Sequence, residues 1–235
     1  MRLTYLLIDL ASIAVPLVAS FHPRLRFHRE WPALLPALLL AGALLLAWDA
    51  VFTQLGVWGF NPQYLLGIYV GGLPLEEILF FICIPYACLF SYHSLLVLDP
   101  QFGYGPKVTR ISAIVICAIC LAGAVLYANC YYTVITLSLL LVFIAWNGLI
   151  KRQPWMGAFL ACYTIMLLPF CIVNGILTGT GLSAPVVWYN PAHMIGARIG
   201  TIPVEDVAFG MLMIGMQTAL FERFKKRPAV SLAHL

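Results

Sequence analysis

The chain has 235 residues, of which 63% are hydrophobic and 9% are charged, and its formal net charge is +4. A soluble domain of this length carries about 25% charged residues, so the composition excludes an ordinary soluble protein and indicates an all-α protein that crosses a membrane several times. The positive charges are divided among short segments between apolar runs, which argues against a nucleic-acid-binding surface.

Seven apolar segments are candidates for membrane-spanning helices, because a helix needs roughly 20 apolar residues to cross the hydrocarbon core. In chain order we expect them at residues 3–20, 33–53, 75–97, 110–128, 131–150, 156–178 and 203–222. The first run is not followed by a small-residue cleavage site, so we interpret it as a retained helix rather than a signal peptide.

The basic residues predict how these helices are oriented. With seven spans, all of the 13 Lys and Arg residues except Arg2 and Arg198 lie on one side of the membrane. They occur in the loops after the first, third and fifth helices and in the C-terminal tail. The positive-inside rule then predicts an outer N-terminus and an inner C-terminus.

An internal repeat accounts for the number of helices. The spacing N-P-x4-G-x3-G-x2-P-x-E-[ED] occurs at 61–77 and again at 190–206, an offset of 190 − 61 = 129 residues. Each repeat contains three helices, and the fourth helix restores the chain direction, so the repeats are parallel and both motifs lie on the outer face. This predicts a 3+1+3 protein with a first half at 1–98, a linker with the fourth helix at 99–129, and a second half with a basic tail at 130–235. The motif glycines, at 67 and 71 and at 196 and 200, form G-x-x-x-G and would allow close contact between the repeats.

Each motif ends in two acids directly after a proline, and we expect Pro74 and Pro203 at the first position of a helix. Acids in a first turn are stabilised by the helix dipole by about 0.3–1 kcal/mol, which explains one carboxylate without any function. Four acids at matched positions in apolar surroundings favour a functional site. Desolvation and a like-charged neighbour would keep at least one of them neutral and able to give up a proton. The candidate catalytic residues are Glu76, Glu77, Glu205 and Asp206.

Aromatic and polar residues near the motifs complete the predicted site. Aromatic faces stabilise cations, although such rings also form belts at membrane interfaces. The candidate substrate-binding residues are Trp58, Phe60, Tyr64, Phe80, Trp188, Tyr189 and Phe209. Three residues within apolar spans, Asp9, Asp49 and Asn174, are polar; the last two correspond between the repeats and would either hydrogen-bond to the acids or join helices. We expect Arg198 to pair with Glu205 or Asp206, and we expect no metal site.

The stretches VWGFNP…LPLEEILFF and WYNP…IPVEDVAFG, with LPFCIVNGILTG before the second, resemble the membrane lycopene cyclases of the heterodimeric type in their tandem-fused form. The resemblance covers nearly the whole chain. It implies an isomerase, or intramolecular lyase, that cyclises the linear ends of lycopene or a related carotenoid without redox change, by protonation of an alkene and closure of the carbocation. It implies no cofactor. The implied partners are a carotenoid from the bilayer, membrane lipid and other enzymes of carotenoid synthesis, and the implied location is the cytoplasmic membrane.

Both motifs are predicted at one face, and an extended carotenoid is about as long as the roughly 30 Å hydrocarbon core. We therefore expect one composite site between the repeats, used once for each end. The main alternative is a small-solute transporter of the same 3+1+3 layout, which would need a polar central cavity. A carotenoid-binding partner without activity is another alternative, and a retinal-binding receptor is disfavoured because no lysine lies in the middle of a span.

Overall fold

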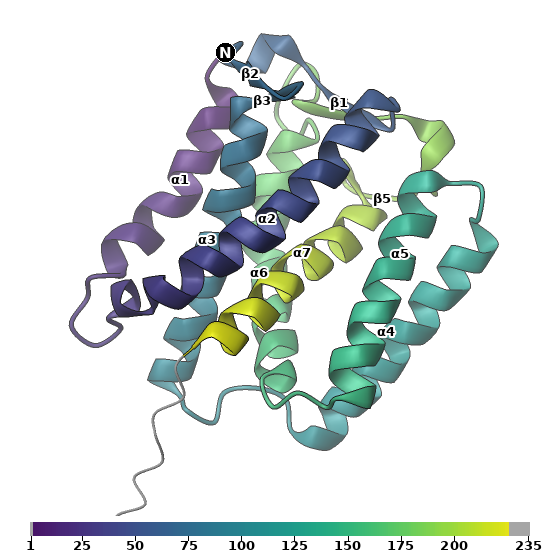
Figure 1. Ribbon diagram of the computed structural model, residues 1–235. Helices are drawn as coiled ribbons and strands as arrows, with labels where there is room; N and C mark the ends of the chain where they lie inside the picture. The colour runs from purple at the N-terminus through teal and green to yellow at the C-terminus, as the bar shows by residue number, and fades with distance from the viewer. Residues whose placement is uncertain (1, 226–235) are drawn as a thin grey trace, which may run out of the picture.

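The computed structural model describes residues 2–225, and this part of the chain folds into one helical bundle (Figure 1). Its long helices are α1 (Thr4–Ala19), α2 (Trp31–Gln54), α3 (Leu75–Leu98), α4 (Pro106–Leu126), α5 (Tyr131–Ile144), α6 (Met156–Leu177) and α7 (Val204–Phe224). A short 3-10 turn, η1 (Phe27–Glu30), precedes α2, and a π-helical turn, η3 (Ala145–Ile150), continues α5. The prediction of an all-helical protein built from two repeated halves is confirmed.

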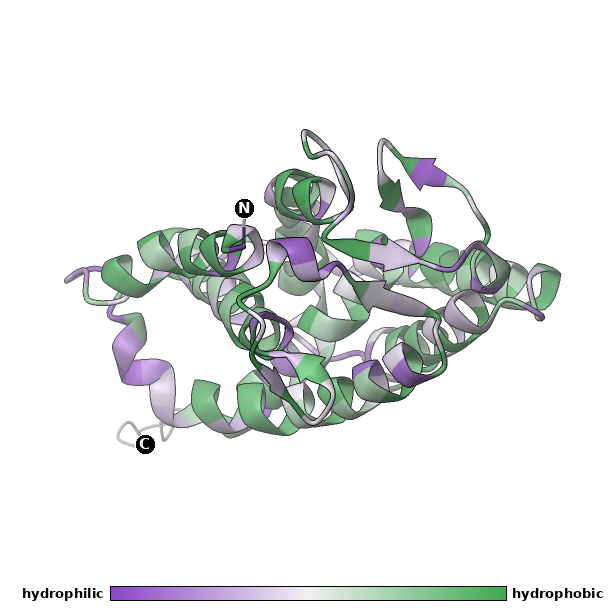
Figure 2. Ribbon diagram, turned by 90° about the horizontal axis from the view of Figure 1, so that it is seen from above, coloured by the Kyte–Doolittle hydropathy of each residue, from purple (hydrophilic) through white to green (hydrophobic). Residues whose placement is uncertain are grey.

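Six helices of the described residues are long and apolar enough to cross a membrane: α2 with η1, α3, α4, α5 with η3, α6 and α7. Helix α1 is also apolar but has 16 residues, about 24 Å at 1.5 Å per residue. The helices consist mostly of hydrophobic residues (Figure 2), and many large hydrophobic side chains on them are exposed, as a lipid-facing surface requires. The chain is therefore a multi-pass membrane protein.

The helices of the two halves pack in equivalent ways. Helix α1 lies along α3, and its counterpart α5 lies along α7; α2 packs against α7, and its counterpart α6 packs against α3. Helix α4 packs mainly against α5 and has no counterpart. Helix α1 is parallel to α3, because the bond from Tyr5 to Glu77 joins their starts, and α5 is parallel to α7, because the bond from Tyr132 to Asp206 joins theirs. The starts of all four helices lie at the same end of the bundle (Figure 1), so the halves run in the same direction.

A two-stranded ribbon joins the halves at the end of the bundle where these helices start. Strand β1 (Trp58–Phe60) pairs with β4 (Val187–Tyr189) in antiparallel fashion, and Gly59 is opposite Trp188. The offset between these two partners, 188 − 59 = 129, is also the offset of the sequence repeat. The pseudo-twofold axis that relates the halves therefore passes between Gly59 and Trp188, and the two motifs begin side by side.

The first residues of each motif cap a short helical turn. The side chain of Asn61 accepts a hydrogen bond from the backbone N–H of Gln63, and that of Asn190 accepts one from Ala192, each at 3.0 Å. The prolines that follow start the 3-10 turns η2 (Pro62–Tyr64) and η4 (Pro191–His193). An N-capping asparagine before a proline is a common start for a helical turn because the proline needs no hydrogen-bond acceptor.

The second part of each motif is a tight hairpin that leads into a helix. Strand β2 (Tyr69–Val70) pairs with β3 (Leu73–Pro74), and β5 (Arg198–Ile199) pairs with β6 (Ile202–Pro203). The prolines that end these hairpins are the N-caps of α3 and α7, with extended ψ angles. The helices thus begin one residue later than predicted, at Leu75 and Val204, because each proline still belongs to the hairpin.

The prediction for the motif glycines is wrong. The glycines at 67, 71, 196 and 200 lie in the loops rather than on helices, and a Cβ atom at any of them would meet no atom within 4 Å. All four have positive φ angles. The motif thus uses glycine for left-handed turn conformations, not for close contact between helices.

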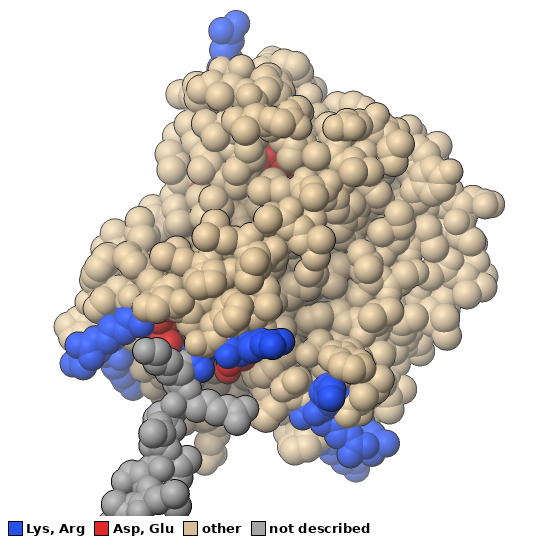
Figure 3. All heavy atoms as spheres, in the orientation of Figure 1, with Lys and Arg blue, Asp and Glu red and all other residues tan. Residues whose placement is uncertain are grey.

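Most basic residues gather at the other end of the bundle, although one basic side chain projects at the opposite end (Figure 3). The loops after α1 and η3, the start of α4 and the end of α7 lie there, away from the hairpins (Figure 1), and they hold Arg24, Arg152, Lys107 and Arg223 among others. Lys226 and Arg227 lie outside the described residues. The molecule is therefore polarised along the bundle axis, with basic loops at one end and the two acidic motifs at the other.

Candidate active site

The four acids of the motifs are all buried at the start of α3 and α7. Their exposed fractions are 1% for Glu76, 7% for Glu77, 1% for Glu205 and 4% for Asp206. Four buried carboxyl groups in one region need specific partners, because an unpaired buried charge is costly. The partners divide the acids into two types.

The first acid of each motif holds its own loop. Oε1 of Glu76 accepts a hydrogen bond from the backbone N–H of Leu66 at 2.5 Å, and Oε1 of Glu205 accepts one from Ile195 at 2.6 Å. Both donors lie ten residues before the acid, just after the capped turn. Glu205 also accepts a hydrogen bond from Thr133 of α5 at 2.6 Å. Glu76 and Glu205 therefore close the motif segments into compact loops over the helix starts.

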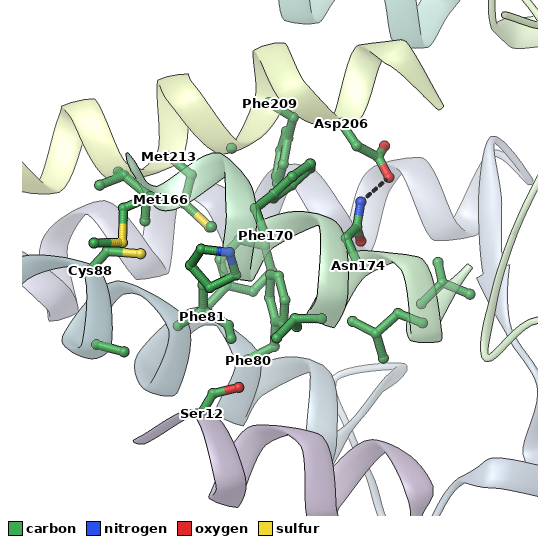
Figure 4. A pocket seen from close by; sticks show the side chains of 18 of the residues that line it. Ser12, Phe80, Phe81, Cys88, Met166, Phe170, Asn174, Asp206, Phe209 and Met213 are labelled. Atoms are coloured by element: carbon green, nitrogen blue, oxygen red, sulfur yellow. Dashed lines mark hydrogen bonds between the residues drawn. The ribbon is translucent and has the colours of Figure 1, made fainter. Parts of the chain in front are cut away.

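The second acid of each motif faces a cavity that both halves build. Glu77 and Asp206 line a cavity of about 320 Å³ between α1, α3, α6 and α7. Figure 4 shows Phe80, Phe81, Phe170 and Phe209 around it, with Cys88, Met166 and Met213 at its far end. The size is at the lower end of ligand-binding pockets, and the mostly aromatic and aliphatic wall fits a hydrocarbon.

On the side of the first half, Glu77 has one hydrogen-bond donor and acidic neighbours. The hydroxyl of Tyr5 donates to Oε2 of Glu77 at 2.6 Å. Asp49 of α2 also lines the cavity, and its Oδ1 accepts a hydrogen bond from the indole N–H of Trp58 at 2.6 Å. Within the described residues, Oδ2 of Asp49 has no partner. Two carboxyl groups of one half therefore face the cavity.

On the side of the second half, Asp206 is surrounded by donors. Tyr132 donates to Oδ1 at 2.6 Å, and Asn174 and Tyr189 donate to Oδ2 at 2.7 and 2.9 Å. Figure 4 shows the bond from Asn174 of α6 to Asp206 of α7. Withdrawal from water, together with the nearby carboxylate of Asp206, raises the pKa of Tyr189 at the end of strand β4 well above its usual value, so its phenol stays a donor. Asp206 thus has the partners that stabilise a carboxylate.

The predicted substrate-binding residues divide between the cavity and its surroundings. The cavity wall contains Trp58, Phe60, Phe80, Tyr189 and Phe209. Tyr64 is fully buried behind the site, where its hydroxyl lies 3.0 Å from that of Ser183. Trp188 is 43% exposed and lies across Gly59 on the ribbon.

The supporting polar residues also differ in where they lie. Asp49 and Asn174 both line the cavity, and Asn174 binds an acid directly. The expected pairing of Arg198 with an acid does not occur in the described part of the chain. Its guanidinium instead donates to the carbonyl oxygen of Thr201 and is exposed, because the β5–β6 turn directs it away from the helix start.

Sequence reasoning missed the two tyrosines that hold the cavity acids. Tyr5 and Tyr132 are each the second residue of the first helix of a half. Their offset is 132 − 5 = 127, so a search at the motif offset of 129 does not align them. A tyrosine at the same place in both first helices was the available signal.

One family model, described as lycopene cyclase, matches the chain over residues 2–95 and 129–224. The two matched segments cover most of the chain, and each contains one motif with its cavity acid. No curated protein and no solved structure matches the chain.

Proposed function

Because the chain belongs to the lycopene cyclase family, we propose that it closes rings at the linear ends of lycopene or a related carotenoid, with Glu77 and Asp206 as the groups that transfer protons. One observation carries this proposal: a single apolar cavity holds one acid from each repeat. Ring closure at an isoprenoid end needs a proton at the start and a base at the end, so two acids in different surroundings serve it.

Ring closure in this cavity would proceed in three steps. A proton added to the inner carbon of the terminal double bond leaves a tertiary cation. That cation forms a carbon–carbon bond with the neighbouring double bond and becomes a cyclic tertiary cation. Loss of a proton from an adjacent carbon forms the ring double bond, so the product is an isomer of the substrate. The rings of Phe80, Phe209 and Trp58 line the cavity, and aromatic faces stabilise cations in such surroundings.

The dimensions favour one site for both ends. A cavity of about 320 Å³ takes the end of a long polyene rather than all of it, and both repeats contribute to its wall. We propose that the rest of the chain extends along the helices and that the carotenoid turns round between two ring closures.

The bilayer is the source of the substrate in this proposal. Ser12 and Pro16 of α1 and Met166 and Pro169 of α6 also line the cavity, and Pro169 is exposed on the outside of the bundle. We place the entrance between these two helices. Proline inside a helix removes a backbone hydrogen bond and bends the helix, which would hold the two helices apart.

The membrane arrangement belongs to the same proposal. The loop after α1 reaches the last turns of α3, where the ring of His93 bonds to the carbonyl oxygen of Leu25 at 2.8 Å. Helix α1 and this loop thus extend along most of α3, and we propose that α1 is a seventh span in a 3+1+3 layout. The basic end then faces the cytoplasm, which puts the N-terminus and the acids on the outer side of the cytoplasmic membrane.

The proposal is tested by expression in cells that accumulate lycopene, with chromatography of the extracted pigments. We expect cyclic carotenoids with the native chain and unchanged lycopene with Glu77→Gln and Asp206→Asn combined. A native chain that is present in the membrane but leaves lycopene unchanged would contradict the proposal. Solute uptake into vesicles by the same preparation would then favour the transporter.

A further inference from the structure

We infer that the two halves have different parts in proton transfer: Glu77 gives the proton to the substrate, Asp206 removes one from the product cation, and the buried Asp9 is a positioning residue that keeps Glu77 supplied with its proton. The inference rests on the proposed function and assigns separate roles within it. It comes from comparing equivalent positions of the two halves.

The equivalent positions differ in one consistent way. The bonds from Tyr5 to Glu77 and from Tyr132 to Asp206 align α1 with α5. One helical turn further on, Asp9 of the first half then corresponds to Thr136 of the second. In the second helices, Asp49 corresponds to Asn174. At both positions the first half has a carboxyl group where the second half has a neutral polar group.

The first half therefore concentrates buried acids without cations. Asp9 is fully buried, and within residues 2–225 neither of its carboxyl oxygens has a hydrogen-bond partner. Oε2 of Glu76 and Oδ2 of Asp49 are also without partners there. No described lysine or arginine forms an ion pair with any of these acids.

Such a cluster holds protons. A buried carboxylate without donors or a cation is costly, and neighbouring carboxylates repel each other, so the group as a whole keeps protons that exposed acids would lose. The titratable groups around Glu77 are Tyr5 and Asp9 of α1, Asp49 of α2, Glu76 of α3, Tyr189 of β4 and Asp206 of α7, with Cys83 close to Asp9. None of these groups carries a positive charge. Of this cluster, Glu77 and Asp49 line the cavity, and we assign the transfer to Glu77, which has the single donor Tyr5 and is the counterpart of Asp206 in the repeat.

The second half instead stabilises the ionised form of Asp206. Its two oxygens accept three hydrogen bonds, from Tyr132, Asn174 and Tyr189. Hydrogen bonds to the charged form favour that form. Asp206 is thus prepared as a base, while Thr136 and Asn174 add no competing carboxylate.

The cycle balances. The O–H bond of Glu77 breaks as a C–H bond forms at the terminal alkene, and the ring bond forms from the electrons of the next double bond. Asp206 then takes a proton from a carbon next to the cyclic cation, and the electrons of that C–H bond form the ring double bond. The site is reset when this proton passes from Asp206 to Glu77.

The roles are separated by the ratio of ring isomers rather than by yield alone. With purified protein in lipid vesicles and lycopene, we expect Glu77→Gln to lower ring formation at least about 100-fold while its residual product keeps the native isomer ratio. We expect Asp206→Asn to change that ratio, or to give a hydroxylated ring, because another base or water then completes the reaction. The reverse pattern, or the same ratio in both variants, would overturn the assignment. A native chain that forms no ring would instead overturn the proposed function.

Asp9 is tested by replacing it with the residue of the other half. Asp9→Thr copies Thr136, so the fold already accommodates this residue at the equivalent place, and Asp9→Asn serves as a second variant. We expect both to lose an infrared band of a protonated carboxyl group and to move the alkaline limit of activity about one pH unit lower, whereas Thr136→Val leaves the band in place. Variants of Asp9 that keep both the band and the alkaline limit would show that Asp9 only fills space.

Discussion

The indole of Trp188 lies across Gly59, its partner in the β1–β4 ribbon, and the two residues are also equivalent positions of the two repeats. The pseudo-twofold axis therefore passes through a contact between a glycine and the largest side chain. The same place cannot hold two large residues, so the symmetry of the backbone requires an asymmetric pair of side chains. The acids below this ribbon are also at equivalent positions with different surroundings: Glu77 has one hydrogen-bond donor, whereas Asp206 has three.

A side chain at Gly59 should destabilise the ribbon. A Cβ atom there would overlap the indole of Trp188, and overpacking of this kind costs about 1–3 kcal/mol. We expect Gly59→Ala to lower the melting temperature of the detergent-solubilised protein. Gly105→Ala is the control, since a Cβ atom there meets nothing within 4 Å; equal melting temperatures of the two variants would contradict the packing described.

Neighbouring acids of one motif should respond differently to the same change. In Glu76→Gln the amide oxygen can still accept the hydrogen bond from Leu66, so we expect ring formation within about threefold of native. Glu77→Gln removes the proton that starts the reaction and should lower the rate at least about 100-fold. Both are measured as carotenoid conversion at equal protein level. A greater loss in Glu76→Gln than in Glu77→Gln would show that the wrong acid has been placed at the cavity.

Filling the cavity should stop the reaction without unfolding the protein. Ala87 of α3 lines the cavity, so a phenyl ring there would occupy the space of the carotenoid end. We expect Ala87→Phe to lose most ring formation while it keeps its melting temperature. Ala118→Phe on the exposed face of α4 is the matched control, and we expect it to be active. Full activity of Ala87→Phe would place the substrate elsewhere.

Removing one donor from Asp206 should change the pH dependence. Because the raised pKa of Tyr189 keeps its phenol protonated, this bond does not itself titrate at neutral pH. A carboxylate that loses a donor holds a proton more readily, and a base works only when it is ionised. We therefore expect Tyr189→Phe to move the acidic limb of the activity profile about one pH unit higher, measured by initial rates in buffered vesicles. A limb that stays in place would mean that Asp206 is not the base.

Much of the architecture could be read from the sequence because it depends on composition and on a repeat. The long apolar runs predict the helices, and the matched motifs predict two halves. The types of some motif residues are explained by contacts with nearby residues of the chain. Asn61 and Asn190 are N-caps, and the prolines after them start a helical turn. Such roles are visible in a single sequence.

The parts that could not be predicted depend on contacts between distant segments. Nothing near Glu76 and Glu77 indicates which one bonds to the peptide of Leu66 and which one faces the cavity, because adjacent residues of a helix point in directions that only the packing fixes. Tyr5 lies 72 residues from Glu77 in the chain. The glycines could not be interpreted correctly because G-x-x-x-G suggests a helix contact, whereas here it belongs to a hairpin.

The central claim is that a buried acid gives its proton to the end of a carotenoid, and mass spectrometry tests it directly. Protein equilibrated in D2O and used in excess over lycopene allows one turnover at each end. We predict one deuterium in the first ring formed, because its hydron comes from Glu77 after exchange with the solvent, whereas a second ring receives either deuterium or the proton recycled from Asp206. Rings formed in this single turnover without any deuterium would contradict the account.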